Sequence, residues 1–328
     1  RFTMDEGLSA AVRQVFVTLY DSGFIYKGSR MVNWDTKLMS AVSDLEVNLE
    51  EQTGKLWSVK YKCGDEFITI ATTRPETILA DTAVAVNPDD ERYKSFIGKT
   101  AIIPIVNREV PIIADEYVDK EFGSGCVKIT PAHDFNDYEI GLKHDLEVIS
   151  CMKLDGTMSD DDFMPENYKN LDRFEARDQI VNELSELGFL VSADDHVIQL
   201  PKGDRSKSIL EPMITDQWFV KTKELADRGI AEVENENMKF IPKNWEKTYF
   251  EWMYNIQDWC ISRQIWWGHQ IPAWYDEEGN IYVATTESEV RAKYELSDDL
   301  KLSQDKDVLD TWFSSALWPF STLGWPEE

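Results

Sequence analysis

The first apolar periodicity along the chain is helical. Apolar side chains recur every three or four residues in the first twenty positions, so they share one face of a helix. Thr3 and Glu6 have the spacing of a capping box, and Gly23 fits a helix end. The pattern predicts a helix between these signals, with a buried face formed by Leu8, Val12, Val15, Phe16, Leu19 and Tyr20.

Short β-type runs follow this helix. Apolar and polar residues alternate from Trp57 to Tyr61, and the later runs are rich in isoleucine and valine. A glycine-rich turn at residues 123–125 precedes the last run. We therefore expect strands at residues 57–61, 67–70, 101–105, 110–113 and 126–130.

The pattern changes in the second half of the chain. Residues 154–170 are polar and predict an exposed loop, whereas apolar spacing from Phe174 to Leu184 predicts a helix that ends near Gly188. Nine of the twelve tryptophans lie between residues 245 and 325, so we place a domain boundary near residue 200. The helical spacing of aromatic residues over 245–259 favours a core position for them. The less regular corner at residues 266–269 leaves a ligand pocket and core equally open.

Length and composition are those of a globular protein of about two domains. The chain has 328 residues, of which 42% are hydrophobic and 29% charged, and it has no apolar run long enough for a membrane helix. Its net charge of −27 opposes long-range attraction to nucleic acid by the chain as a whole. Four cysteines without C-x-x-C spacing, and no secretory signal, predict reduced thiols in a cytoplasmic protein. Because Met is the fourth residue, we expect the sequence to be part of a longer protein.

A first candidate constellation covers residues 71–82. Thr73, Arg74 and Thr77 follow an apolar strand, with Asp81 a few residues later. Hydroxyls and a guanidinium at such a corner suit a substrate that carries a phosphate or carboxylate. The competing interpretation is a turn whose threonines satisfy their own backbone, and composition alone favours it.

A second constellation covers residues 128–137. Lys128 and Thr130 alternate, so they face one side of a strand, and Asp134 and Asp137 share a face if a helix starts there. Such a group would suit binding an ammonium and positioning a water. The alternatives are a helix cap with a surface ion pair, a weakly supported cation site that includes His133, and a Cys126–His133 nucleophile.

Together these motifs resemble the bacterial valyl-tRNA synthetases, a family of class I aminoacyl-tRNA synthetases. The combination of Thr-Thr-Arg-Pro-Glu-Thr at residues 72–77 with Lys-Ile-Thr-Pro-Ala-His-Asp-x-x-Asp at 128–137 is specific, because the related leucyl and isoleucyl enzymes differ in the second motif. Further matching segments span nearly the whole chain, at residues 1–7, 33–35, 43–47, 214–218, 262–272 and 307–318.

The resemblance implies an α+β fold in which a β-barrel-containing editing domain is inserted into a Rossmann-type catalytic domain that is only partly present. It implies a helical entry segment at residues 1–35, the editing domain at 36–200 and a tryptophan-rich partial second half of the catalytic domain at 201–328. The family's two adenylate-forming signatures are missing, so we do not expect this stretch to activate amino acids. ATP is implied only for the parent synthetase, and no zinc is expected because no Cys-Pro-x-Cys follows Asn33-Trp34.

The function that the resemblance implies is post-transfer editing. A hydrophobic pocket cannot strongly reject an isostere that adds only a hydroxyl, so a second site must hydrolyse Thr-tRNA(Val) and spare Val-tRNA(Val). By resemblance, Asp137 would hold the substrate ammonium, Asp134 and Thr130 would bond the threonine hydroxyl, and Arg74 and Lys128 would face the tRNA end. The implied catalytic residues are Asp137, Lys128 and Thr73, and the implied substrate-binding residues are Arg74, Thr77, Asp81, Thr130 and Asp134.

Editing of this kind needs no metal or cofactor, since a bound water would be the nucleophile. The expected partners are the 3′ end of tRNA(Val) and its threonine or valine ester, with no membrane, and the chain is expected to be a monomer. One alternative is a tRNA 3′-end docking module that is inactive without the rest of the enzyme. The other is an unrelated small-molecule hydrolase that uses His133 and the two aspartates.

Overall fold

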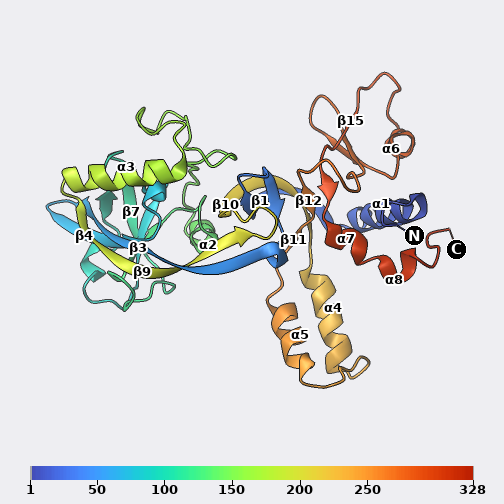
Figure 1. Cartoon of the computed structure of the whole chain (residues 1–328), viewed down its shortest axis with the longest axis horizontal. Coiled ribbons are helices and arrows are strands. Elements are labelled where there is room, and N and C mark those ends of the chain that lie inside the picture. The colour runs from blue at the N-terminus through green and yellow to red at the C-terminus, as the bar shows by residue number, and fades with distance from the viewer. Residues whose placement is uncertain (1, 328) are drawn as a thin grey trace. The chain divides into compact units, whose positions relative to one another are not determined.

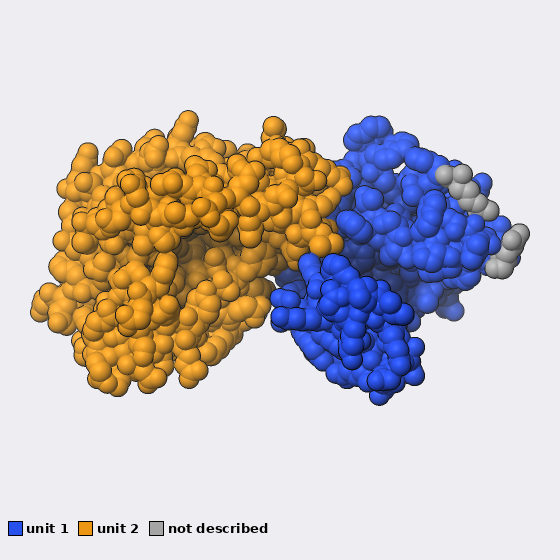
Figure 2. All heavy atoms as spheres, turned by 60° about the horizontal axis from the view of Figure 1, so that its bottom comes forward, with its two compact units in different colours: residues 1–30, 215–328 blue, residues 31–214 orange. Residues whose placement is uncertain are grey.

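Residues 2–327 are described by the computed structural model and divide into two compact units (Figures 1 and 2). Within that range, unit 1 comprises the residues up to 30 and from 215 onward, and unit 2 comprises residues 31–214. The sequence-based boundaries fall after residues 35 and 200. Residues 201–214 stay with unit 2 because strand β9 pairs with β3 as far as Gly203 and Glu211 bonds Arg74 and Arg173.

Unit 2 is built on one mixed sheet. Its strand order is β4-β3-β6-β7-β5-β8, with β9 paired to β3, and only the β5–β7 pair among these is parallel. The end strands β4 and β8 contact each other, so the sheet curls into a half-barrel. The strands are β3 Val47–Cys63, β4 Glu66–Thr72, β5 Ala83–Val86, β6 Thr100–Ile102, β7 Glu109–Ala114, β8 Cys126–Ile129 and β9 Leu190–Gly203.

Alternation along β3 and β4 explains why these strands form. Val59 pairs with Ile70 and Tyr61 with Ile68, and all four side chains are fully buried. The predicted strands at 57–61 and 67–70 are therefore confirmed. The strand predicted at 101–105 is wrong at its end, because β6 stops at Ile102 before Pro104.

Two helices and several short elements complete unit 2. Helix α3 confirms the helix predicted to end near Gly188, since its last residue is Glu186. The loop predicted at 154–170 is correct in having no helix or strand of its own, but Met158, Met164 and Tyr168 are buried in it. The elements are β2 Ser40–Val42, η1 Asp44–Glu46, η2 Pro75–Ala80, η3 Lys94–Phe96, α2 Phe135–Lys143 and α3 Arg173–Glu186. The strands β1 Ile25–Asp35 and β10 Glu211–Val220 each have residues in both units.

Unit 1 gathers around the predicted N-terminal helix. Helix α1, Glu6–Asp21, buries Val12 and Phe16 against Trp218 and Phe313 in one core cluster. The predicted Thr3–Glu6 capping box is wrong, because Asp5 is the N-cap residue and its side chain forms no capping bond. Its described strands are short, and the Rossmann-type assignment stays a prediction. The other elements are α4 Lys223–Glu234, α5 Trp245–Tyr254, β11 Trp259–Cys260, β12 Ser262–Arg263, β13 Ala273–Tyr275, β14 Ile281–Val283, α6 Glu287–Lys293, β15 Ser303–Gln304, β16 Val308–Leu309, α7 Thr311–Ser315 and α8 Trp318–Ser321.

The core position predicted for the aromatic face over 245–259 is wrong for the residues in helix α5. Helix α5 contains no buried residue, and Trp245 and Trp252 are 56% and 58% exposed. The helix packs mainly on its neighbour α4. Trp259 lies beyond it in β11, is half-buried and packs against the core cluster of α1, so the prediction is confirmed for this residue. At the 266–269 corner Trp266 is 90% exposed, so this residue is not core. No helix in the described part of the chain combines the length and apolar character needed to cross a bilayer.

Candidate functional site

The first constellation forms the corner between β4 and η2. The Thr72 hydroxyl accepts the Arg74 amide at 3.0 Å, and the Thr77 hydroxyl donates to the Arg74 carbonyl at 3.0 Å. These local bonds support the turn interpretation for the threonines. Thr73 is half-buried, whereas Thr77 and Asp81 are buried.

The pairing of β5 with β8 brings the two constellations together. Ala83 pairs with Ile129, and therefore Asp81 lies opposite the end of β8. The Asp81 Oδ1 atom accepts Lys128 Nζ at 3.0 Å and the Thr130 hydroxyl at 2.6 Å, and Lys128 also bonds the Thr130 hydroxyl. All three residues are at least 93% buried. The predicted site residues Asp81, Lys128 and Thr130 thus form one cluster.

Tyr61 completes this cluster and was not among the residues predicted from sequence. Its fully buried hydroxyl donates to Asp81 Oδ2 at 2.6 Å. Burial raises the pKa of Asp81, although the charge of Lys128 and the hydrogen bonds from Thr130 and Tyr61 oppose that change. Burial and the neighbouring Asp81 raise the pKa of Tyr61 well above its usual value. Only its inward place in the β3 alternation hints at Tyr61.

Asp137 connects helix α2 to the end of β8. Its Oδ2 atom accepts the Thr130 amide at 2.8 Å, seven residues earlier in the chain. Burial raises the pKa of Asp137 to about 7, and the charge of Lys128 only partly offsets this. A carboxyl with a pKa near neutrality gains or loses its proton readily at physiological pH, which suits acid–base chemistry.

Asp134 has the helix-capping role that the sequence left open. Its Oδ1 atom accepts the amides of Asn136 at 2.8 Å and Asp137 at 3.1 Å, so it is the N-cap of α2. The residue is half-buried, and its other oxygen has no hydrogen bond among those found in the described residues. A capping role and a substrate-binding role are therefore compatible at this position.

Replacing Asp134 separates these two roles. We expect Asp134→Ser to keep the cap and the stability within a few tenths of a kcal/mol, whereas Asp134→Ala costs about 1 kcal/mol. Urea denaturation measures both values. Equal stability of the two variants would contradict the capping role. Loss of ester hydrolysis in Asp134→Ser, which keeps the cap, would point to contact with the substrate.

Arg74 does not extend into open space. Its Nε donates to Glu76 at 3.1 Å and its Nη1 to the His133 carbonyl at 2.9 Å, while its Nη2 bonds Glu211. Burial lowers the pKa of Arg74, but the charges of Glu211 and Glu76 outweigh it and the net change is upward. Neither acidic partner was predicted from sequence: Glu76 lies only two residues from Arg74 but was not singled out, and Glu211 is 137 residues away.

His133 and Cys126 do not have the properties of a nucleophilic pair. His133 accepts the Cys151 amide at Nε2, 2.9 Å away, and burial lowers its pKa to about 3, so the ring is neutral. Burial raises the pKa of Cys126 to about 12, so its thiolate is scarce at neutral pH. Within residues 2–327, no group of three or more histidine, cysteine or acidic side chains has the arrangement of a metal site.

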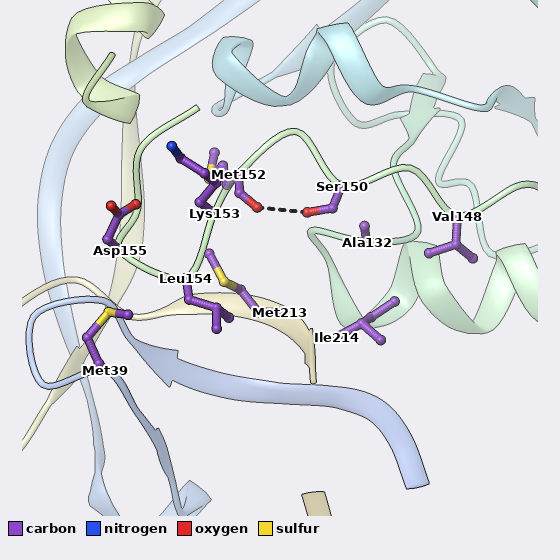
Figure 3. A pocket seen from close by; sticks show the side chains of 10 residues that line it. All are labelled: Met39, Ala132, Val148, Ser150, Met152, Lys153, Leu154, Asp155, Met213 and Ile214. Carbon is purple, nitrogen blue, oxygen red and sulfur yellow. Dashed lines mark hydrogen bonds between the residues drawn. The ribbon is translucent and has the colours of Figure 1, made fainter. Parts of the chain in front are cut away.

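A cavity of about 660 Å³ lies beside Ala132 (Figure 3). Ala132, from the second constellation, forms part of its wall, and Figure 3 places Ser150 and Val148 beside it. Its volume is within the range of small-molecule sites. The lining is largely aliphatic and thioether, and consists of Met39, Ala132, Val148, Ser150, Met152, Lys153, Leu154, Asp155, Met213 and Ile214.

Comparison with known proteins identifies the family. The model of the class I tRNA synthetases (I, L, M and V) matches residues 1–328, the whole chain. The chain belongs to this family. Among curated class I synthetases, a valine–tRNA ligase of Legionella pneumophila is 58% identical over 329 aligned residues, and one of Francisella tularensis is 57% identical over 330.

These matches cover all of this chain but only 36% of each relative's length. Among solved structures, the LeuRS of a LeuRS–tRNA–LeuAMS ternary complex from Agrobacterium radiobacter is 16% identical. That match covers 96% of this chain and 44% of the other, with a TM-score of 0.34. A score this low does not establish a shared overall arrangement, and the family assignment rests on the sequence matches.

Proposed function

We propose that the cluster around Asp81, Lys128 and Asp137 hydrolyses threonine mistakenly esterified to tRNA(Val). The observation that most directly supports this proposal is that the two motifs, 47 residues apart at Asp81 and Lys128, meet in one buried polar cluster. That pair of motifs resembles the valine enzymes, and the similar curated proteins are valine–tRNA ligases. Both facts support threonine as the amino acid to be removed.

The proposed reaction is ester hydrolysis by a bound water. The water oxygen bonds to the ester carbonyl carbon, and the bond from that carbon to the ribose oxygen breaks. One proton of the water ends on the ribose oxygen, so the products are free threonine and tRNA with an intact 3′ end. Asp137 is suited to relay this proton or to hold the substrate ammonium, because its pKa of about 7 makes both protonation states accessible.

Selectivity for threonine requires a polar partner for its side-chain hydroxyl. The second carboxylate oxygen of Asp134 and the Thr130 hydroxyl are the proposed partners, close to Asp137 in the chain. Valine has no hydroxyl and would leave the second Asp134 oxygen without this bond, which disfavours its binding. We propose that Lys128 and Thr73 lie toward the ester and the terminal adenosine.

We further propose that the chain is part of a valine–tRNA ligase whose partners are ATP, valine and tRNA(Val). The two adenylate-forming signatures are absent from this sequence, so the ATP-dependent step requires other residues. A second candidate function for the isolated chain is a docking module for the tRNA 3′ end. This module would be inactive without the rest of the enzyme, and the net charge of −27 agrees with that, because a strongly acidic chain binds tRNA only weakly by itself.

The deciding experiment measures hydrolysis of Thr-tRNA(Val) and Val-tRNA(Val) by this chain. We expect loss of the threonine ester to be selective, and Asp137→Ala to abolish it. Glu139→Ala is the matched control, because Glu139 is an exposed acidic residue of the same helix α2. A folded Asp137→Ala protein with unchanged hydrolysis would refute the assignment. No hydrolysis of either ester would favour the docking module.

A further inference from the structure

We infer that Glu76 is a positioning residue for the 130–137 segment and acts through Arg74. This inference rests on the proposed hydrolytic function of that segment. Glu76 is fully buried, so its side chain is not positioned to touch a tRNA or an ester. Any effect of Glu76 on hydrolysis must therefore pass through the groups that it holds.

The groups around Glu76 form a buried ion-pair network. Arg177 of helix α3 donates to both Glu76 oxygens, from Nε at 2.7 Å and from Nη2 at 2.9 Å. Arg74 donates to Glu76 Oε1 at 3.1 Å. Bidentate pairs of this kind fix the plane of the guanidinium and of the carboxylate. Helix α3 thus holds Glu76, and Glu76 orients Arg74.

A second carboxylate, 137 residues later in the chain, also holds Arg74. Glu211 at the start of β10 is 3% exposed, bonds Arg74, and accepts Arg173 Nε at 2.6 Å. The network therefore contains two carboxylates and three guanidinium groups, so the charge of each buried acid is compensated. Burial raises the pKa of Glu76, but bonds from Arg177 and the charge of Arg74 outweigh it and the pKa falls to about 2. Glu76 is therefore ionised at neutral pH.

The network reaches the proposed site at one backbone atom. Arg74 Nη1 donates to the His133 carbonyl at 2.9 Å, in the turn between Thr130 and the cap residue Asp134. Asp137 in turn holds the Thr130 amide. A shift of the His133 carbonyl would move Asp134 and Thr130 relative to each other. Small displacements of reacting groups lower the rate of the chemical step more than they weaken binding.

The test compares Glu76→Gln with wild type in steady-state hydrolysis of Thr-tRNA(Val). Glutamine keeps the size but removes the charge that holds two arginines. We expect kcat to fall about 10- to 100-fold with KM changed less than about threefold. Arg177→Lys keeps the charge but loses the bidentate geometry, so we expect a smaller fall in kcat of the same kind. The matched control is Glu183→Gln, which removes a carboxylate of helix α3 that is bonded to Tyr168 and should leave kcat unchanged.

Hydrogen exchange supplies a readout that does not depend on activity. We expect Glu76→Gln to speed exchange at the Thr130 and Asp137 amides while protection in the β3–β9 ribbon stays as in wild type. Unchanged kcat and unchanged exchange in a folded Glu76→Gln protein would overturn the positioning role, as would a rise in KM alone. If Glu76→Gln does not fold, Arg177→Lys carries the same two measurements. If the wild-type chain hydrolyses no Thr-tRNA(Val), the proposed hydrolytic function is refuted. The hydrogen-exchange rates at the Thr130 and Asp137 amides would still decide whether Glu76 positions the 130–137 segment.

Discussion

Replacing Lys128 with methionine is expected to destabilise unit 2 by about 3–5 kcal/mol. The reason is the environment of Asp81, which is fully buried and receives Lys128 Nζ at 3.0 Å. Without the ammonium, Asp81 must stay charged in an apolar interior or take up a proton, and both states cost free energy. Methionine keeps the volume of the side chain, so the loss of stability measures removal of the charge and not the creation of a cavity.

Two further variants make this expectation specific. Lys143→Met breaks the bond to Asp115 at 2.9 Å, but the Lys143 side chain is 61% exposed, so we expect a loss below about 1 kcal/mol. The double variant Asp81→Asn/Lys128→Met removes both charges and should recover much of the stability. Urea denaturation with hydrogen exchange in β5 and β8 measures all three. A Lys128→Met protein as stable as Lys143→Met would show that Asp81 carries no charge in the wild type.

Local patterns predicted the local structure of this chain well. The α1 periodicity, the β3–β4 alternation and the Asp134 cap are each determined by residues within a few positions, and each is present. The prediction for Trp245 and Trp252 was wrong because a helical stripe shows only which residues share a face. Whether that face is buried depends on what packs against it, and helix α5 has its main contacts with α4 alone.

The candidate site shows the same division between local and long-range information. The two motifs named Asp81, Lys128, Thr130 and Asp137, and strand pairing brings the first three together. The partners of Arg74 were not predictable, because Glu211 is 137 residues away and carries no local signal. An arginine beside a turn suggests a substrate anion from sequence alone. In the fold its donors are directed to Glu76, Glu211 and the His133 carbonyl.

Replacing Asp137 with asparagine should reduce hydrolysis and increase stability at the same time. Asparagine keeps an oxygen that can accept the Thr130 amide, now at 2.8 Å from Asp137, but it cannot ionise. We expect hydrolysis of Thr-tRNA(Val) to fall by roughly 10²- to 10⁴-fold, the usual contribution of a positioned acid or base. In wild type, we expect the rate to rise with pH through an apparent pKa near 7.

The gain in stability should depend on pH with a definite sign. Burial raises the pKa of Asp137 from 3.8 to about 7, so between these values the folded protein binds a proton that the unfolded chain has released. Wild-type stability contributed by this group is therefore complete below pH 3.8 and is lost as the pH rises toward 7. The stability of the asparagine variant does not change with pH in this way. The free energy of unfolding of the variant relative to wild type should therefore grow across that interval, to at most about 4 kcal/mol, and then level off.

Urea denaturation of both proteins at several values between pH 4 and pH 8 measures this difference. Asp145→Asn is the matched control, because Asp145 follows helix α2, is exposed, and accepts no side-chain hydrogen bond found in the described residues. A difference that is constant with pH would mean that Asp137 is ionised throughout and held by Lys128, which would favour the ammonium-binding role over proton relay. A difference that grows toward pH 7 would show that unit 2 tolerates a carboxyl that destabilises it. Such a cost is typical of a residue retained for chemistry rather than for folding.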